Sequence, residues 1–296
     1  MSDITLSSAT RSNLLSLQNT SGLIGRTQER LATGLKINSA IDDALAFFKA
    51  RNLNSRASDL ASIKDTITGG ISVLTAAVQG LESIESVLKQ MKALAQSAIS
   101  APESSTRAKL ASQFNELRSQ VDNLAEDSSF NGVNLLKSSN AAFSAGADQL
   151  TVKFNERTDT AAVNQLVISG LKAADFTSIV ATSATATGTA GSATVWGQTG
   201  AKAVTAINSA IRAIDSALVT VRQVAQNFGT NSALLSIRAD FTTNLINTLK
   251  AGAADLVNAD LNEESANLLS LQTRQQLGTI SLSIAQRSEQ SILRLF

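Results

Sequence analysis

The sequence predicts a mainly α fold, a long antiparallel helical bundle or coiled-coil rod formed by the N- and C-terminal segments, with a small middle region that contains a β-hairpin. Apolar residues recur at alternating steps of three and four through most of both chain halves, the period of a helix with one buried seam. Aromatic residues make up only 4% and there is one proline, as is typical of helices packed by aliphatic side chains. Between residues 141 and 177 this helical period is lost.

The composition limits the kinds of site that the chain can hold. Cysteine, histidine and tyrosine are absent, which excludes disulfides, thiol nucleophiles, Cys/His zinc sites and histidine general bases. The net charge is +1 and the basic residues are dispersed, so the basic stripe of a nucleic-acid interface is missing. No uninterrupted apolar run of about 18 residues could span a bilayer. We therefore expect no catalytic residue, no cofactor, no metal, no nucleic-acid partner and no membrane partner.

The first predicted helix begins in the run that holds Asn13 and Leu14. Its seam continues at steps of three and four through Leu17, Ser21, Ile24, Gln28, Leu31 and Leu35. Gly34 is placed to end the helix in the left-handed conformation. Because two polar residues interrupt the seam, this helix is marginal alone and needs a partner.

A short non-helical segment follows. We expect an extended piece through Ile37 and then a capping box, in which Ser39 caps a second helix and Asp42 lies at its third position. Asp43 also lies near the positive end of that helix. Adjacent helical residues point in different directions, so capping is favoured over catalysis for these two carboxylates.

The second helix has the most regular pattern of the chain. Apolar or small residues recur every seven positions in two sets, Leu60, Ile67, Leu74, Leu81, Leu88 and Ala95 with Ile63, Gly70, Ala77, Ile84, Met91 and Ala98. Pro102 marks the end of this helix and the first turn of the next. The third helix carries an apolar face between residues 110 and 124. An Asn-Gly turn formed by Phe130, Asn131 and Gly132 comes after it.

The middle of the chain alternates like β-structure. Residues 150–154 and 164–168 predict two short strands in one or two hairpins. Residues 178–200 are almost entirely Ala, Thr, Ser and Gly around Trp196, a low-complexity connector. We expect Trp196 to cover a loop rather than bind a ligand, and the Ser/Thr density between residues 177 and 199 would suit O-glycosylation.

The longest predicted helix spans residues 204–256, about 80 Å at 1.5 Å per residue, so it needs equally long partners. Ser232 and Thr242 are unexplained polar steps in its seam. Gly252 and residues 258–260 mark a break. The tail that follows is apolar nearly all round the helix and must be buried by neighbouring molecules. The chain therefore reads as a polymerising structural subunit.

Three stretches also resemble the landmarks of bacterial flagellins. Residues 30–44 are similar to the signature near the start of the family, residues 130–136 to its second landmark, and residues 291–296 to its C-terminus. The ending and the short middle region resemble alphaproteobacterial members most closely. The landmark and assembly residues are Asn13, Leu14, Arg30, Leu31, Gly34, Ile37, Asn38, Ser39, Asp42, Asp43, Phe130, Asn131, Gly132, Leu277, Ile284, Ile292, Leu295 and Phe296.

The resemblance implies three regions. A terminal coiled-coil domain that lines the inner tube would use residues 1–44 and 254–296. A helical rod domain would use residues 45–140 and 200–253, and residues 141–199 would form a short β-containing connector.

The resemblance also implies partners and a location. The chain would form a helical homopolymer, alone or mixed with other flagellins, in the extracellular flagellar filament. It would leave through the flagellar type III export apparatus with an export chaperone, and meet the filament cap and hook-junction proteins. The N-terminus lacks the basic segment and apolar block of a cleavable secretory signal, which agrees with such a route.

Three alternatives stay open at this point. A hook–filament junction protein shares both chain ends with flagellins. A cytoplasmic coiled-coil scaffold would have the same helical periodicity. An enzyme, such as a hydrolase that uses Asp, Glu, Ser and Lys, is the least favoured, because the acids lie at predicted helix ends or on polar faces and no nucleophile motif is present.

Overall fold

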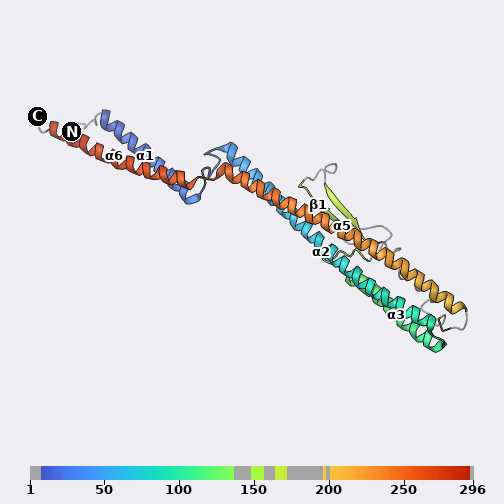
Figure 1. The fold of residues 1–296 in the computed structure, drawn as a ribbon. Coiled ribbons are helices and arrows are strands. Elements are labelled where there is room, and N and C mark those ends of the chain that lie inside the picture. Colours follow the sequence, from blue (N-terminus) through green and yellow to red (C-terminus); the bar gives the residue numbers. More distant parts are fainter. Residues whose placement is uncertain (1–7, 137–147, 157–163, 172–195, 198–200, 294–296) are drawn as a thin grey trace. The chain divides into compact units, whose positions relative to one another are not determined.

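The computed structural model describes residues 8–136, 148–156, 164–171, 196–197 and 201–293. Its elements are α1 (Ser8–Thr33), α2 (Ala44–Ser100), α3 (Ser104–Asp127), β1 (Gln149–Lys153), β2 (Gln165–Ser169), α5 (Ala201–Val257) and α6 (Leu261–Leu293). Figure 1 shows these elements on the ribbon. The predicted mainly α fold with a small β-hairpin is confirmed.

The chain divides into two compact units. One unit comprises Met1–Ala57 and Asn247–Phe296, and the other comprises Ser58–Ile246. The region boundaries expected from the sequence, near residues 44 and 254, stay a prediction.

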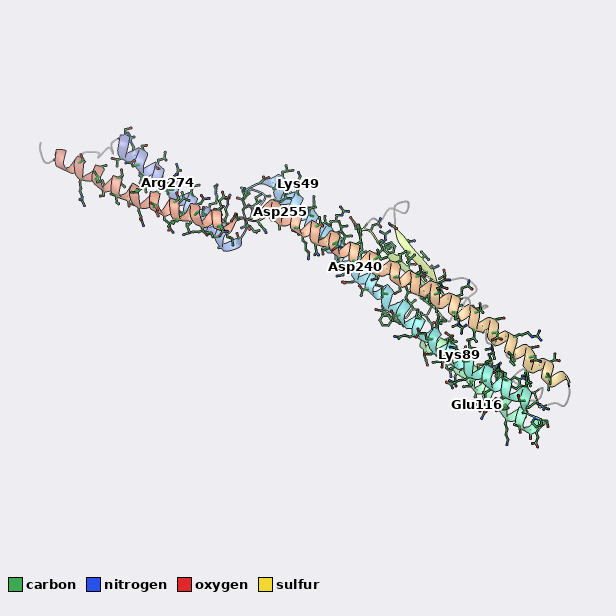
Figure 2. All side chains as sticks on the ribbon, viewed as in Figure 1. Lys49, Lys89, Glu116, Asp240, Asp255 and Arg274 are labelled. Atoms are coloured by element: carbon green, nitrogen blue, oxygen red, sulfur yellow. The ribbon has the colours of Figure 1, made fainter. Side chains whose placement is uncertain are left out.

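In the second unit, α2 and α5 run antiparallel. The Glu85 carboxylate on α2 accepts from Arg222 on α5 at 2.8 Å, and Lys92, seven residues later on α2, donates to Asp215, seven residues earlier on α5, at 2.5 Å. The apolar seams of both helices face each other in one core, together with α3 and the hairpin. Figure 2 shows Lys89 on α2 and Glu116 on α3 among the exposed side chains around this core.

The hairpin pairs β1 with β2 antiparallel, in a register that sets Leu150 opposite Ile168 and Val152 opposite Leu166. Val152 is fully buried, since β1 packs at Gly70 of α2, where an added Cβ would lie 2.8 Å from Val152 Cγ2 and 3.4 Å from Leu235 Cδ1 of α5. Because Gly70 has no side chain, both β1 and α5 can pack against α2 at this position.

Trp196 belongs to the core rather than covering a loop as the sequence predicted. Its side chain is fully buried, and its ring centroid lies 5.0 Å from that of Phe114 on α3. Arg107 Nε donates to the Trp196 carbonyl oxygen at 3.0 Å, which fixes this position against the start of α3. O-glycosylation was predicted for Ser and Thr between residues 177 and 199, and all of these lie outside the described residues, which here include only 196–197.

Three helix boundaries differ from their predictions. Pro102 precedes the N-cap residue Glu103 and so lies before the first turn of α3, not within it. Gly252 lies inside α5, because this helix continues to Val257 and the break comes at residues 258–260. The second helix begins at Ala44, so the capping box predicted for Ser39 and Asp42 is wrong in its position.

Thr242, one of the polar steps in the seam of α5, is explained by a local bond. It is 4% exposed, and its Oγ1 donates to the Arg238 carbonyl oxygen at 2.8 Å. The hydroxyl is thus satisfied within its own helix, and the methyl group is left to pack in the seam.

Segments of α2 and α5 are long and apolar enough to cross a membrane by length and composition. The core helices of many proteins meet the same criterion, and here the apolar seams of both helices line a shared core.

Candidate assembly surface

In the first unit, α1 and α6 lie side by side and antiparallel (Figure 1). Arg30 near the end of α1 binds Glu264 near the start of α6, with Nη1 and Oε1 2.8 Å apart. Further along the pair, Leu17 of α1 packs over Gly278 of α6, where an added Cβ would lie 2.7 Å from Leu17 Cδ2. The helices therefore touch through an ion pair at one end and a close steric contact near the other.

Little of α6 is covered within the subunit. Among its residues with described burial, 261–288, Glu264 is the only buried one. Leu268, Leu271 and Leu282 are half-buried and share the face toward α1. Large apolar side chains occupy the opposite face and are more than half exposed: Leu269, Leu277, Ile280 and Ile284. A helix with two opposite apolar faces and one partner leaves a face for another molecule.

More exposed apolar side chains lie elsewhere in the same unit. Ile41, Leu45 and Phe48, at positions i, i+4 and i+7, are 95%, 67% and 53% exposed. Leu14 and Leu15 on α1 are exposed as well. We define the outer face of α6 (Leu269, Leu277, Ile280 and Ile284) as the α6 apolar face, because it is the most continuous of these groups.

The signature segment that follows α1 ties the two chain ends together. Gly34 ends α1 with φ +71°, as the sequence predicted. The backbone then pairs with the break between α5 and α6, since Lys36 N donates to the Val257 carbonyl oxygen at 2.7 Å and Ala259 N donates to that of Gly34 at 2.9 Å. This pairing places Arg30 beside Glu264.

The two signature carboxylates have different tasks. Asp42 Oδ2 accepts from Ser39 N and Ser39 Oγ, each at 3.0 Å, and closes a turn before the helix. Asp43 caps α2, because its Oδ1 accepts from Ala46 N at 3.0 Å. The bonds from the Ser39 backbone and hydroxyl hold the pKa of Asp42 below its ordinary value. The sequence indicates both carboxylates but suggests the wrong capping residue for α2, because both Ser39 and Asp43 could cap a helix that begins in this segment.

The second landmark, at residues 130–136, is the predicted Asn-Gly turn. Asn131 and Gly132 have φ +50° and +81°, and Phe130 and Val133 exchange two backbone hydrogen bonds at 3.0 Å. Asn134 Nδ2 donates to the Ala125 carbonyl oxygen at 2.9 Å, so the turn also caps the end of α3.

The structure brings together only part of the predicted set of residues. Arg30, Leu31, Gly34, Ile37, Asn38, Ser39, Asp42 and Asp43 lie in the first unit, in or beside the paired segment. Asn13 is half-buried on α1, whereas Leu14, Leu277 and Ile284 are exposed. Phe130, Asn131 and Gly132 belong to the second unit. Ile292 lies in α6 without a described side chain, and Leu295 and Phe296 lie outside the described residues.

Sequence reasoning missed Glu264, Gly278 and Asp260. Asp260 Oδ1 accepts from Asn262 N at 2.8 Å and caps α6, a role that Glu263, three residues later at the spacing of a capping box, could have indicated. No local pattern marks Glu264 or Gly278, since the burial of each depends on α1, more than 200 residues earlier.

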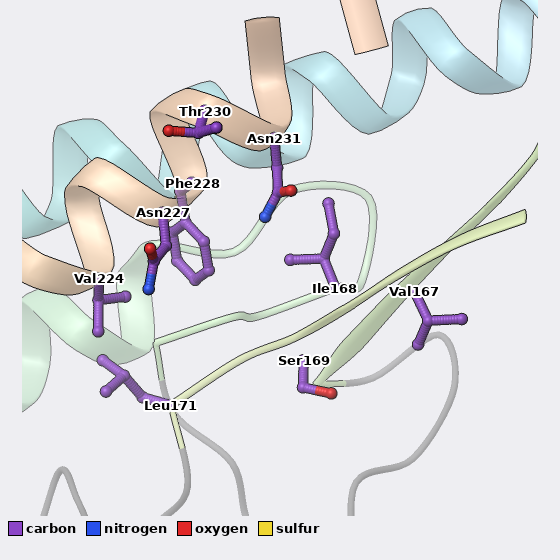
Figure 3. A pocket seen from close by; sticks show the side chains of 9 residues that line it. All are labelled: Val167, Ile168, Ser169, Leu171, Val224, Asn227, Phe228, Thr230 and Asn231. Atoms are coloured by element: carbon purple, nitrogen blue, oxygen red, sulfur yellow. The ribbon is translucent and has the colours of Figure 1, made fainter. Parts of the chain in front are cut away.

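One groove in the second unit has a volume of about 340 Å³ and lies between β2 and α5. Figure 3 shows its lining, in which Ile168 of β2 lies toward Asn231 of α5, and Leu171, which follows β2, lies toward Val224. No ionisable side chain lines it. Within the described part of the chain, no group of three or more acidic side chains is placed to hold a metal ion.

Comparison with known proteins gives a consistent result. The model of the bacterial flagellin N-terminal helical region matches residues 4–141, and that of the C-terminal helical region matches residues 211–296. Flagellin FljM of Caulobacter vibrioides is 34% identical, over 96% of this chain and 95% of its own length. Flagellin C of Rhizobium meliloti is 28% identical over 91% of each chain. A flagellin of Brucella melitensis is 27% identical over 100% of this chain and 99% of its own.

Proposed function

The chain belongs to the bacterial flagellin family and is a structural subunit that polymerises into the flagellar filament for motility, and from this premise we propose which surface joins it to its neighbours and how it leaves the cell. The α6 apolar face is the principal contact between copies in the polymer. Its four side chains are each more than half exposed in the single subunit. Their burial by neighbours would supply a driving force of about 25 cal/mol for each Å² of apolar surface removed from water.

Two opposite faces on α6 give the subunit two directions of contact. The face with Leu268, Leu271 and Leu282 is used within the chain, against α1. The α6 apolar face is left for a second copy, and a contact between unlike surfaces repeated by rotation and translation generates a helical filament. In the filament, alone or mixed with other flagellins, the terminal residues 1–44 and 254–296 form the inner tube. Residues 45–140 and 200–253 form the outer rod, with residues 141–199 as its β-containing connector.

Partners outside the polymer follow from the family. The chain leaves the cell through the flagellar type III export apparatus with the help of an export chaperone, and without cleavage of a signal peptide. It then adds beneath the filament cap, beyond the hook-junction proteins. The small intrachain contact of α6 supports this route, because a helix with few tertiary contacts unfolds at low cost. The family is structural, and the subunit acts mechanically rather than as an enzyme.

The alternatives are less well supported. A hook–filament junction protein is not favoured, because the relatives named above are flagellins that match over at least 91% of their length. A cytoplasmic scaffold does not fit a chain that belongs to a filament family.

Export can be tested in cells. We expect the protein to be recovered in sheared filaments, and mass spectrometry of its peptides to find the N-terminal segment that contains Ser2–Leu6 still attached. When the export apparatus is inactivated, the protein should remain inside the cell. Recovery of the protein from the medium of such cells, or a mass that shows removal of an N-terminal segment, would contradict this route.

A further inference from the structure

The apolar seams of α2 and α5 do not by themselves define how far one helix is shifted along the other. Each helix has 57 residues, and both seams repeat every seven positions. The buried residues of α5 include Ile207, Ile214, Val221, Phe228 and Leu235. A shift by seven residues, about 10 Å at 1.5 Å per residue, again sets apolar layers against apolar layers. Another feature must select the observed register.

Charged residues flank these seams with the same period. Glu85 and Lys92 are seven residues apart on α2, and Asp215 and Arg222 are seven apart on α5. Glu85 Oε1 accepts from Arg222 Nη2 at 2.8 Å and from Arg222 Nε at 3.0 Å. The Nζ of Lys92 lies 2.5 Å from Asp215 Oδ1. Both pairs are satisfied at once only because each helix carries an acid followed by a base and the helices are antiparallel.

Either shift by seven residues brings like charges together. A shift in one direction sets Arg222 opposite Lys92, and a shift in the other sets Asp215 opposite Glu85. Each shift also leaves the other two charges opposite uncharged residues. We infer that Glu85, Lys92, Asp215 and Arg222 form a charge code that selects the register of α2 against α5. Like charges at flanking positions select orientation and register in this way in coiled coils.

Because these charged side chains are partly exposed, they are better suited to select the register of α2 against α5 than to stabilise the fold. The side chains of Glu85 and Arg222 are 22% and 57% exposed, so each pair alone adds little to stability. The penalty for two like charges is present only in a shifted register. Gly70 gives a competing steric explanation, because Leu235 packs 3.4 Å from the position of an added Cβ there. A variant that keeps Gly70 and lacks the four charges distinguishes the steric explanation from the charge code.

Register can be measured by cross-linking, because the chain has no cysteine of its own. Val78 and Gly229 stand one further heptad along from the Glu85–Arg222 pair, so Val78→Cys with Gly229→Cys reports the observed register through a short thiol-to-thiol cross-linker. Ile71→Cys with Gly229→Cys reports one shifted register, and Val78→Cys with Ser236→Cys reports the other. In the full chain with its natural charges, we expect only the first pair to cross-link.

The code is tested by exchanging charges. In Asp215→Lys with Arg222→Glu, the observed register sets like charges together and both shifted registers set opposite charges together. We expect the native cross-link to fall by about an order of magnitude and the shifted cross-links to form. Adding Glu85→Lys with Lys92→Glu should restore the native cross-link. An unchanged native cross-link in the first variant would overturn the proposal.

A neutral variant covers the case in which the exchanged chain does not fold. Glu85→Gln, Lys92→Gln, Asp215→Asn and Arg222→Gln together keep the apolar seams and Gly70 and remove every charge of the code. We expect native and shifted cross-links in the same sample. If only the native pair cross-links, packing in the core, such as the contact of Leu235 at Gly70, sets the register and the charge code does not.

Discussion

Arg30 Nη1 lies 2.8 Å from Glu264 Oε1, and this pair joins residues that are 234 positions apart in the chain. The side chains of Arg30 and Glu264 are 29% and 10% exposed. Glu264 is the only buried residue of α6 between residues 261 and 288. Its partner, Arg30, belongs to the family signature at residues 30–44. The pair fixes where α6 begins against the end of α1, and so fixes which side of α6 faces outward.

Glu264→Gln should loosen this pair of helices. The amide that replaces the Glu264 carboxylate leaves the Arg30 guanidinium without its charged partner. We therefore expect the free energy of the local unfolding that separates α1 from α6 to fall by about 1–3 kcal/mol. Hydrogen exchange of the amides in both helices measures it. Glu263→Gln, at the exposed neighbouring position, is the matched control and should change the protection by less than about 0.5 kcal/mol. Equal effects of the two substitutions would contradict the assigned role.

Two glycines of the second unit should respond in opposite directions to alanine. At Gly170, an added Cβ would lie 2.5 Å from the Leu135 carbonyl oxygen and 2.9 Å from that of Asp148, so Gly170→Ala should destabilise by about 1–3 kcal/mol. Gly69 lies within α2, and a Cβ added there would have no neighbouring atom within 4 Å. Gly69→Ala should therefore raise the free energy of unfolding by about 0.5–1 kcal/mol. Urea unfolding followed by the fluorescence of the single tryptophan reports both. If both substitutions change the free energy of unfolding in the same direction, this would be evidence against the packing at Gly170.

The start of α2 should depend on Asp43 rather than Ser39. Asp43→Ala removes the acceptor for Ala46 N and should cost about 0.5–2 kcal/mol. Asp43→Asn keeps an acceptor oxygen and should cost much less. Hydrogen exchange at the first turn of α2 distinguishes these outcomes, and a larger loss of protection there from Ser39→Ala than from Asp43→Ala would restore the capping box predicted from the sequence.

Glu85 should make the stability of the second unit depend on pH. Bonds from Arg222 and Lys89 hold the pKa of Glu85 below its ordinary value of 4.5. Since the folded state binds this proton more weakly than the unfolded state, the contribution of Glu85 to stability is complete above pH 4.5. It is lost as the pH falls from there through the lower folded pKa.

This dependence can be measured as a difference between variants. The stability difference between the natural chain and Glu85→Gln should be constant at neutral pH and shrink below pH 4.5, in urea titrations followed by tryptophan fluorescence. Glu82→Gln, an exposed carboxylate one turn earlier, is the control. A difference that grows as the pH falls would have the wrong sign.

The sequence predicts the elements of this fold well, because their signals are local. The heptads of α2, the left-handed glycine after α1 and the Asn-Gly turn at residues 131–132 each depend on residues a few positions apart. Gly252 misleads, because a glycine inside a helix resembles a break. In the structure it lies within α5, where an added Cβ would be 3.8 Å from Leu53 Cδ1 of α2.

The assembly surface on α6 is harder to predict from the sequence than the elements of the fold. The tail is apolar nearly all round, so periodicity alone cannot say which face α1 covers and which stays open. Glu264 and Gly278 decide this, through contacts with Arg30 and Leu17 that no local pattern reveals.

Polymerisation of the purified full chain, with and without the α6 apolar face, tests the proposed assembly most directly. We expect the natural chain to form filaments visible by electron microscopy. Leu277→Ser, Ile280→Ser and Ile284→Ser together should leave the helical circular dichroism unchanged, because these side chains are exposed in the subunit, and should abolish pelleting of filaments. Gln272→Ser with Gln276→Ser, at other exposed positions of α6, should assemble normally. Filaments formed by the triple variant at the same protein concentration as by the natural chain would contradict the role of this face.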